Sequence, residues 1–350
     1  MPKIVRNIFA DVKEDLRARI IGAYLILAAL TSVTWVAALI AFQGSPVLLS
    51  TAFLAFSFGL RHAVDADHIA AIDNVTRKLM QQGRRPVALG LFFSLGHSSA
   101  VVLGTLAIGL VAPRVGDRFE GFKDFGSVAG TLVSGLFLCA IAVSNLVIFF
   151  STYRSFRQRT GTAEGLDALL AKRGFIARIC RHLFNLISQS WQMLPLGFLF
   201  ALGFDTASEI AILGISASEL STGLPAAKIM IFPMLFTAGM TLVDTTDGVL
   251  MLGAYGWAFH NPRRKIAYNL TVTFVSSLVA MIVGGVELFG LLGDQMELKG
   301  AFWNMISTMN DHFGMIGYGI IALFVASWIA SFLILKMKSA HEIGRADVRT

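Results

Sequence analysis

The sequence predicts an all-α integral membrane protein with eight transmembrane helices and both termini in the cytoplasm. Composition is the first reason: of 350 residues, 55% are hydrophobic and only 15% are charged, whereas a soluble domain carries about 25% charged residues. Long uncharged runs are the second. Residues 20–42 contain no charge, and a helix of that length crosses a hydrocarbon core of about 30 Å. No small-residue cleavage site follows this run, so we interpret it as a retained helix and not as a signal peptide.

Hydropathy divides the chain into eight spans, which we treat as a single transmembrane domain over residues 1–350. A β-barrel would instead alternate in hydrophobicity over short strands. The predicted spans cover residues 20–42, 47–72, 86–112, 126–150, 193–215, 228–255, 268–293 and 314–335. The longest connection, residues 151–192, holds seven Lys and Arg, and its amphipathic stretch predicts a segment that rests on the cytoplasmic membrane surface.

The distribution of basic residues is the third reason and gives the orientation. With the N-terminus in the cytoplasm, 23 of the 29 Lys and Arg lie in cytoplasmic segments and five lie in external loops, as the positive-inside rule predicts. The net charge of +7 therefore reflects orientation in the lipid bilayer and needs no nucleic-acid partner. Cys139 and Cys180 lie far apart, so we expect neither a disulfide nor a thiolate metal site.

The second span carries five ionisable residues within eight positions, namely Arg61, His62, Asp65, Asp67 and His68. Charged groups at membrane depth are costly and usually serve a function, and imidazoles beside carboxylates are donors that transition metals accept. We predict that His62, Asp65, Asp67 and His68 bind a metal. In an ideal helix Asp67 points away from the others, so binding by all four requires an unwound or distorted turn, which a cavity wall permits.

Three further spans bring polar residues to membrane depth. We predict that these residues and Arg61 form an ion pathway or support the metal ligands: His97, Asp205, Glu209, Asp244 and Asp247. The two pairs of acids are spaced by four and by three residues, so each pair shares a helix face. In total six acids face one Arg at membrane depth, and unpaired carboxylates there must be protonated or await a cation.

Each of these residues also has an ordinary structural interpretation. His62 and His68 can be hydrogen-bonded core histidines, and His97 can bond across helices without touching a metal. Asp65 can pair with Arg61, or it can orient His68 by accepting a hydrogen bond from the ring nitrogen that does not bind the metal. The acids of the later spans can be buried hydrogen-bond anchors. Four polar residues that follow the second span are expected at an ordinary cytoplasmic helix end: Asp73, Asn74, Arg77 and Lys78.

Four motifs in this order resemble the NiCoT family of nickel/cobalt transporters. They are His62-x4-Asp67-His68, Leu95-Gly96-His97-Ser98, Leu202-Gly203-Phe204-Asp205-Thr206 and the run from Gly239 to Gly248. The resemblance implies a multi-pass permease of the bacterial inner membrane that takes up Ni²⁺ or Co²⁺ by secondary transport. It implies no ATPase subunit, no enzyme activity and no cofactor, since the ion is the substrate. It also implies that His62, Asp67 and His68 are essential.

Three other functions are alternatives to uptake. A membrane metalloenzyme generally needs more histidine ligands than a chain with seven histidines supplies, and no HExxH occurs. A structural or accessory protein does not explain six buried acids. Export of Ni²⁺ or Co²⁺ remains an alternative, because helix patterns do not encode direction, and the sequence does not predict an oligomeric state.

A short internal similarity links the third and sixth spans. The segment from Phe93 to Ser98 resembles the segment from Phe236 to Thr241, and the predicted topology runs these spans in opposite directions. An inverted repeat of spans two to four and five to seven would follow, with the site at their interface.

Overall fold

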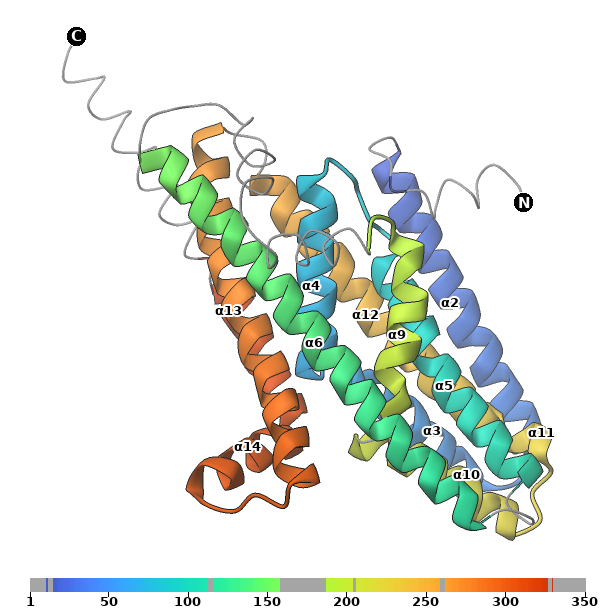
Figure 1. Cartoon of the computed structure of the whole chain (residues 1–350). Helices are drawn as coiled ribbons and strands as arrows, with labels where there is room; N and C mark the ends of the chain where they lie inside the picture. Colours follow the sequence, from blue (N-terminus) through green and yellow to red (C-terminus); the bar gives the residue numbers. More distant parts are fainter. Residues whose placement is uncertain are drawn as a thin grey trace.

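The structure is a computed structural model that describes residue 11 and residues 15–111, 116–157, 187–203, 206–258, 262–326 and 329. None of these residues forms a strand, and the helices gather into one bundle (Figure 1). The first half contains α2 (Leu16–Ala41), α3 (Pro46–His62), α4 (Ala66–Gln81), α5 (Leu89–Val111) and α6 (Gly116–Arg157). The second half contains α9 (Met193–Phe200), α10 (Ala207–Ser221), α11 (Ala226–Ile229), α12 (Ile231–Ala258), α13 (Pro262–Gln295), α14 (Ala301–Asp311) and a helix over Phe313–Ala326.

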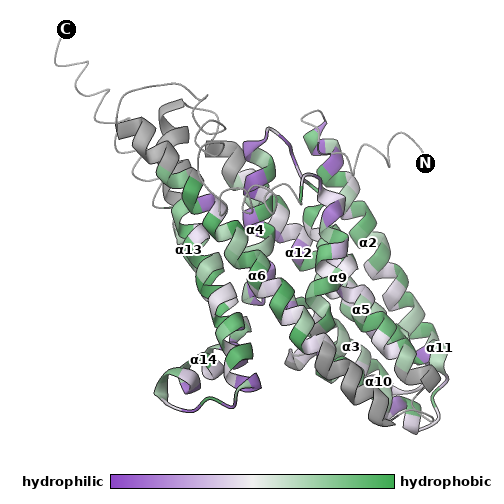
Figure 2. Cartoon of the chain, viewed as in Figure 1, coloured by the Kyte–Doolittle hydropathy of each residue, from purple (hydrophilic) through white to green (hydrophobic). Residues whose placement is uncertain are grey.

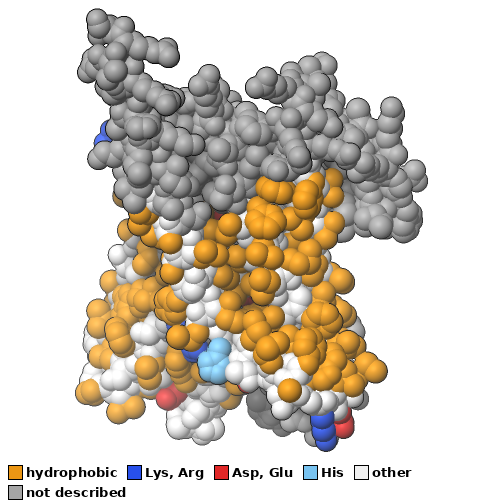
Figure 3. Space-filling view, turned by 90° about the vertical axis from the view of Figure 1, so that its left-hand side faces the viewer, with side chains coloured by type: hydrophobic (Ala, Val, Ile, Leu, Met, Phe, Trp, Pro, Cys, Tyr) orange, Lys and Arg blue, Asp and Glu red, His pale blue; other side chains and the backbone are white. Residues whose placement is uncertain are grey.

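The lengths and the composition of the helices fit a multi-pass membrane protein. Five helices are long and apolar enough to span, and two bent helix pairs raise that number to seven within the described part of the chain. Only 22% of the spanning window of α2 is buried. The described helices are largely composed of hydrophobic residues (Figure 2), and apolar side chains cover much of the face shown in Figure 3, as lipid contact requires. The predicted span 193–215 appears as α9 and α10, which flank residues outside the described set.

The second span is broken at the predicted site. α3 ends at His62 and α4 begins at Ala66, and their axes differ by 52°. Between them the backbone N–H of Asp65 donates to the carbonyl oxygen of His62 over 2.9 Å, and Asp65 itself is extended, with φ −62° and ψ 147°. This turn interrupts the helical ladder, so the distorted turn that a shared site required is present.

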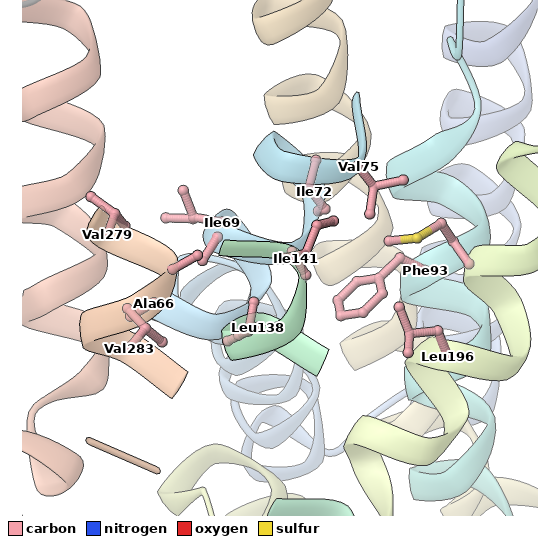
Figure 4. Close-up of a cluster of buried hydrophobic side chains, with 14 of the residues drawn as sticks. Ala66, Ile69, Ile72, Val75, Phe93, Leu138, Ile141, Leu196, Val279 and Val283 are labelled. Carbon is pink, nitrogen blue, oxygen red and sulfur yellow. The ribbon is translucent and has the colours of Figure 1, made fainter. Parts of the chain in front are cut away.

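The environment of the last turns of α4 differs from the prediction. α4 continues to Gln81, and four polar residues expected at an ordinary cytoplasmic helix end are at most 1% exposed: Asp73, Asn74, Arg77 and Lys78. They are buried because α6 and α13 pack against α4 at this depth. Asn74 bonds Asn145 of α6 and the carbonyl oxygen of Ser276 of α13, and Nζ of Lys78 donates to the carbonyl oxygen of Ile187. Apolar residues of both helices close over α4, among them Leu138 and Val279 (Figure 4).

Two parts of the chain for which the sequence makes predictions lie outside the described residues. Most of the connection 151–192, including its amphipathic stretch, falls among residues 158–186, and only the end of α6 and residues 187–192 are described. Asp205 also lies outside the described residues. The orientation of the chain and the eighth span remain predictions.

Candidate metal centre

Three histidines meet inside the bundle where α3, α4 and α5 come together. His62 is the last residue of α3, His68 lies in the first turn of α4, and His97 lies in the middle of α5. One ring nitrogen from each lies within 4.8 Å of the others, and the residues are 1%, 0% and 3% exposed. The break after α3 creates this arrangement, because it turns His68 back toward the end of the preceding half-helix.

His62 is oriented by a carboxylate. Its Nδ1 lies 3.0 Å from Oδ2 of Asp65 and 3.2 Å from Oγ of Ser208, while its Nε2 lies 2.8 Å from Nε2 of His97. The carboxylate accepts a hydrogen bond from Nδ1–H, which leaves the lone pair of Nε2 directed at the other histidines. Asp65 thus contacts His62, and among the described ion pairs none joins it to Arg61 or to His68.

His68 has an equivalent support from another helix. Its Nδ1 lies 3.3 Å from Oδ2 of Asp244 on α12, and Asp244 in turn accepts a 2.6 Å hydrogen bond from Oγ of Ser94. α12 reaches this depth because α5 has a glycine there: a Cβ on Gly90 would overlap the carbonyl oxygen of Asp244. Nε2 of His68 is buried without a hydrogen-bond partner among the described residues, so its lone pair is available for an ion.

His97 links the cluster to α10. Its Nε2 lies 2.9 Å from Oε1 of Glu209 as well as close to His62, and Glu209 accepts a 2.9 Å hydrogen bond from Oγ1 of Thr206. Glu209 is 1% exposed. The donors around the centre are therefore three imidazole nitrogens and one carboxylate oxygen.

The spacing of the His62 and His97 nitrogens suits a shared first-row transition metal. Imidazole nitrogens bind such ions at about 2.0–2.1 Å, so the two nitrogens of His62 and His97, 2.8 Å apart, would subtend roughly 85° at a shared ion. Near-right angles between nitrogen and oxygen donors are typical of tetragonal and square-planar Ni²⁺ and Cu²⁺ sites.

Within the described part of the chain, the rings of the three histidines form no hydrogen bond to three other predicted site residues, Asp67, Asp247 and Arg61. Oδ1 of Asp67 and Oδ2 of Asp247 are buried without a hydrogen-bond partner among the described residues. Arg61 is exposed, beside Gly314 of the helix over Phe313–Ala326. Ser94 was not among the predicted site residues, although it lies one turn before His97 on α5, a spacing that places both on one face.

Comparison with known proteins gives a consistent result. The family model NicO, described as high-affinity nickel-transport protein, matches residues 48–334. The chain is 55% identical to the high-affinity nickel transport protein of Cupriavidus necator, covering 92% of this chain and 93% of that protein. It is 47% identical to the nickel transporter NixA of Staphylococcus aureus, over 83% and 86%, and 34% identical to the cobalt transport protein NhlF of Rhodococcus rhodochrous, over 92% of each. No solved structure matches. The chain therefore belongs to the NicO family of nickel-transport proteins.

Proposed function

We propose that this protein is a secondary transporter that takes up Ni²⁺ across the bacterial inner membrane through a single transmembrane domain. The observation that carries the proposal is the convergence of His62, His68 and His97, each with a ring nitrogen within 4.8 Å of the others and all buried. A cation that loses its water inside the bilayer needs several replacement donors, and this cluster offers them. The relatives named as nickel transporters support the choice of ion.

The proposed ligands are the three histidines, with Glu209 beside them. His97 joins the set expected from the sequence, and Asp67 remains a proposed ligand because it brings a buried oxygen without a partner. Asp65 and Asp244 act by holding Nδ1 of His62 and of His68, which directs both Nε2 lone pairs into the cluster, where an ion would replace the contact of His62 with His97. Partners that orient metal-bound histidines in this way typically change affinity by 10–100-fold when they are removed.

The membrane potential is the proposed driving force. Two positive charges that move inward gain roughly 4.6 kcal/mol per 100 mV of inside-negative potential, which corresponds to a concentration ratio of about 2000. No ATPase subunit is needed for this gain. Carboxylates of the pathway that do not hold the ion can couple proton movement to transport.

Cobalt is a second proposed substrate. The relative from Rhodococcus rhodochrous is named a cobalt transport protein, and a site of nitrogen and oxygen donors accepts both ions. Because affinity rises from Co²⁺ to Ni²⁺ at a given site, we propose that Ni²⁺ is preferred. Uptake is favoured over export, since a high-affinity site suits the capture of a trace ion from outside.

Accumulation of radioactive nickel in cells that express the chain tests the proposal. We expect His62→Ala and His68→Ala to abolish accumulation of trace Ni²⁺ while both variants still reach the membrane. The matched control is His312→Ala, because His312 is exposed and its Nδ1 bonds the carbonyl oxygen of Thr308 one turn earlier in the chain. Wild-type accumulation by both cluster variants would remove the site from this part of the chain.

A further inference from the structure

Two helix crossings near the histidine cluster are alike in atomic detail. Where α3 crosses α12, a Cβ on Gly59 would overlap the carbonyl oxygen of Phe236. Where α9 crosses α5, a Cβ on Gly197 would overlap the carbonyl oxygen of Phe93. Phe93 and Phe236 are the first residues of the two similar sequence segments, so equivalent positions of α5 and α12 receive equivalent glycines.

The glycines of the long helices α12 and α5 make matching contacts with the short helices α3 and α9. A Cβ on Gly239 of α12 would overlap the carbonyl oxygen of Phe56, three residues before the glycine of α3. A Cβ on Gly96 of α5 would overlap the carbonyl oxygen of Leu194, three residues before the glycine of α9. Both crossings therefore have the same register, which makes α3 equivalent to α9 and α5 equivalent to α12.

The ends of the two short helices extend this equivalence to the site. α3 ends at His62 and α9 ends at Phe200. The ring of His62 lies 5.5 Å from that of Phe236, and the ring of Phe200 lies 5.5 Å from that of Phe93. Each half-helix thus ends with a ring packed on the matching phenylalanine of the long helix that it crosses.

The second half-helices correspond as well. α4 begins Ala66-Asp67-His68-Ile69-Ala70 and α10 begins Ala207-Ser208-Glu209-Ile210-Ala211. Each is preceded by one extended residue, with φ −62° and ψ 147° before α4 and φ −81° and ψ 142° before α10. The third residue of each half-helix, His68 or Glu209, belongs to the cluster.

The remaining two helices, α6 and α13, contact each other through a glycine on each. A Cβ on Gly135 of α6 would lie 3.1 Å from the carbonyl oxygen of Gly284, and a Cβ on Gly284 of α13 would lie 2.8 Å from the carbonyl oxygen of Gly135. A reciprocal contact of this kind is expected where a two-fold axis passes between equivalent elements. In Figure 1, α3, α6 and α12 run toward one end of the bundle, while α5, α9 and α13 run toward the other.

We infer that residues 46–157 and 193–295 are two inverted copies of one three-span unit, and that transport proceeds when the two copies exchange conformations around the histidine cluster. Broken helices in corresponding positions, with the substrate site at the repeat interface, are the arrangement that alternating access uses. This inference rests on the proposed transport function, but it predicts helix proximities that can be measured whether or not nickel moves.

The two copies differ in one respect in this structure. α4 packs against α5, α6, α12 and α13, whereas α10 packs against α3, α5, α11 and α12, with at most marginal contact to α6 and α13 among the described residues. Asn74 holds α4 in place: its Oδ1 accepts from Nη2 of Arg77 at 2.7 Å and from Nδ2 of Asn145 on α6 at 2.9 Å. Its own Nδ2 donates to the carbonyl oxygen of Ser276 on α13 over 3.4 Å.

Exchange of conformations has a specific geometric consequence. α4, which packs against α13 in this structure, is released. α10 then packs against α6, which is the equivalent contact in the other copy. Under the repeat correspondence, Ile215 of α10 takes the position of Asn74, and Ser127 of α6 takes the position of Ser276. The pair Ile215 and Ser127 therefore comes together in the opposite conformation, as Asn74 and Ser276 do in this one.

Cysteine cross-linking in membrane vesicles tests this consequence, in a chain whose two natural cysteines are replaced by serine. One double variant carries Ile215→Cys and Ser127→Cys, and a short bismaleimide is added with and without Ni²⁺. We expect cross-linking well above that of a mixed control, Ile215→Cys with Ser276→Cys, which the repeat does not relate. We also expect the cross-linked protein to stop accumulating nickel.

A second variant keeps the test decisive if cysteines disturb packing. Asn145→Ala removes one hydrogen bond that holds Asn74, and loss of such a bond shifts the balance of conformations by about tenfold. Cross-linking of Ile215→Cys with Ser127→Cys should rise by up to that factor in this background. Cross-linking no faster than the mixed control in both backgrounds would overturn the inference. Cross-linking as expected in a chain that moves no nickel would uphold the exchange and reject the proposed function.

Discussion

At the scale of single residues, His97 is the sharpest test of the ligand set. The sequence left it as a hydrogen-bonding residue or a support, whereas the structure places its Nε2 2.8 Å from that of His62. We predict that His97→Ala lowers uptake of trace Ni²⁺ by at least about 100-fold, because one of three nitrogen donors is lost. Uptake of radioactive nickel, normalised to the amount of protein in the membrane, measures the effect. Residual uptake above a tenth of wild type would make His97 a bystander.

Asp244 tests the idea that carboxylates orient the ligands. It contacts Nδ1 of His68 at 3.3 Å and accepts from Ser94 at 2.6 Å. We predict that Asp244→Asn weakens Ni²⁺ binding by about 10–100-fold, since an amide can present a donor to Nδ1 in place of an acceptor. Ser94→Ala should have a smaller effect in the same direction. Nickel titration of the purified protein, compared with its melting temperature in detergent, separates the roles. Equal losses of binding and thermal stability would make Asp244 structural.

At the scale of elements, the glycine crossings predict different outcomes for two glycines of the same helix. A Cβ on Gly239 would overlap backbone of α3, whereas one on Gly253 would meet nothing within 4 Å. Gly239→Ala should therefore destabilise the protein by about 1–3 kcal/mol or more, because backbone cannot move aside as a side chain does. Gly253→Ala should be neutral or stabilise by up to about 1 kcal/mol. Thermal unfolding in detergent measures both, and equal behaviour of the two variants would contradict the crossing.

The second span illustrates what sequence reasoning can and cannot provide. The spacing of His62, Asp67 and His68 within an apolar run predicted a distorted turn, because no ideal helix brings them together. The burial of the last turns of α4 was not predicted, because hydropathy measures the polarity of a segment and not what covers it. Asn74 and Arg77 are polar yet buried, since Asn74 bonds Arg77, Asn145 of α6 and the carbonyl oxygen of Ser276 of α13. Such partners lie up to 202 positions away and become visible only in three dimensions.

At the scale of the whole molecule, orientation can be tested with two exposed side chains from the two ends of the bundle. Trp191, before α9, is 54% exposed, and Met296, after α13, is 61% exposed. We predict that a cysteine in place of Trp191 reacts with an impermeant maleimide only in inverted vesicles, whereas one in place of Met296 reacts only in intact spheroplasts. Both are made in the chain without natural cysteines. The reverse pattern would invert the topology, and with it the end from which nickel enters.

The whole molecule also has to convert membrane potential into accumulation. If Ni²⁺ crosses alone, two charges move per cycle, and each 100 mV contributes about 4.6 kcal/mol, so accumulation should change about tenfold for every 30 mV or so. Proteoliposomes that hold the purified chain, with potassium gradients and valinomycin to set the potential, measure this slope. His312→Ala is expected to keep the wild-type slope, because the exposed His312 lies outside the cluster. Exchange of one Ni²⁺ against two protons would move no net charge. Accumulation that does not depend on the potential but does depend on a pH gradient would therefore reject the potential as the driving force. Protons carried by the buried carboxylates would then take that role.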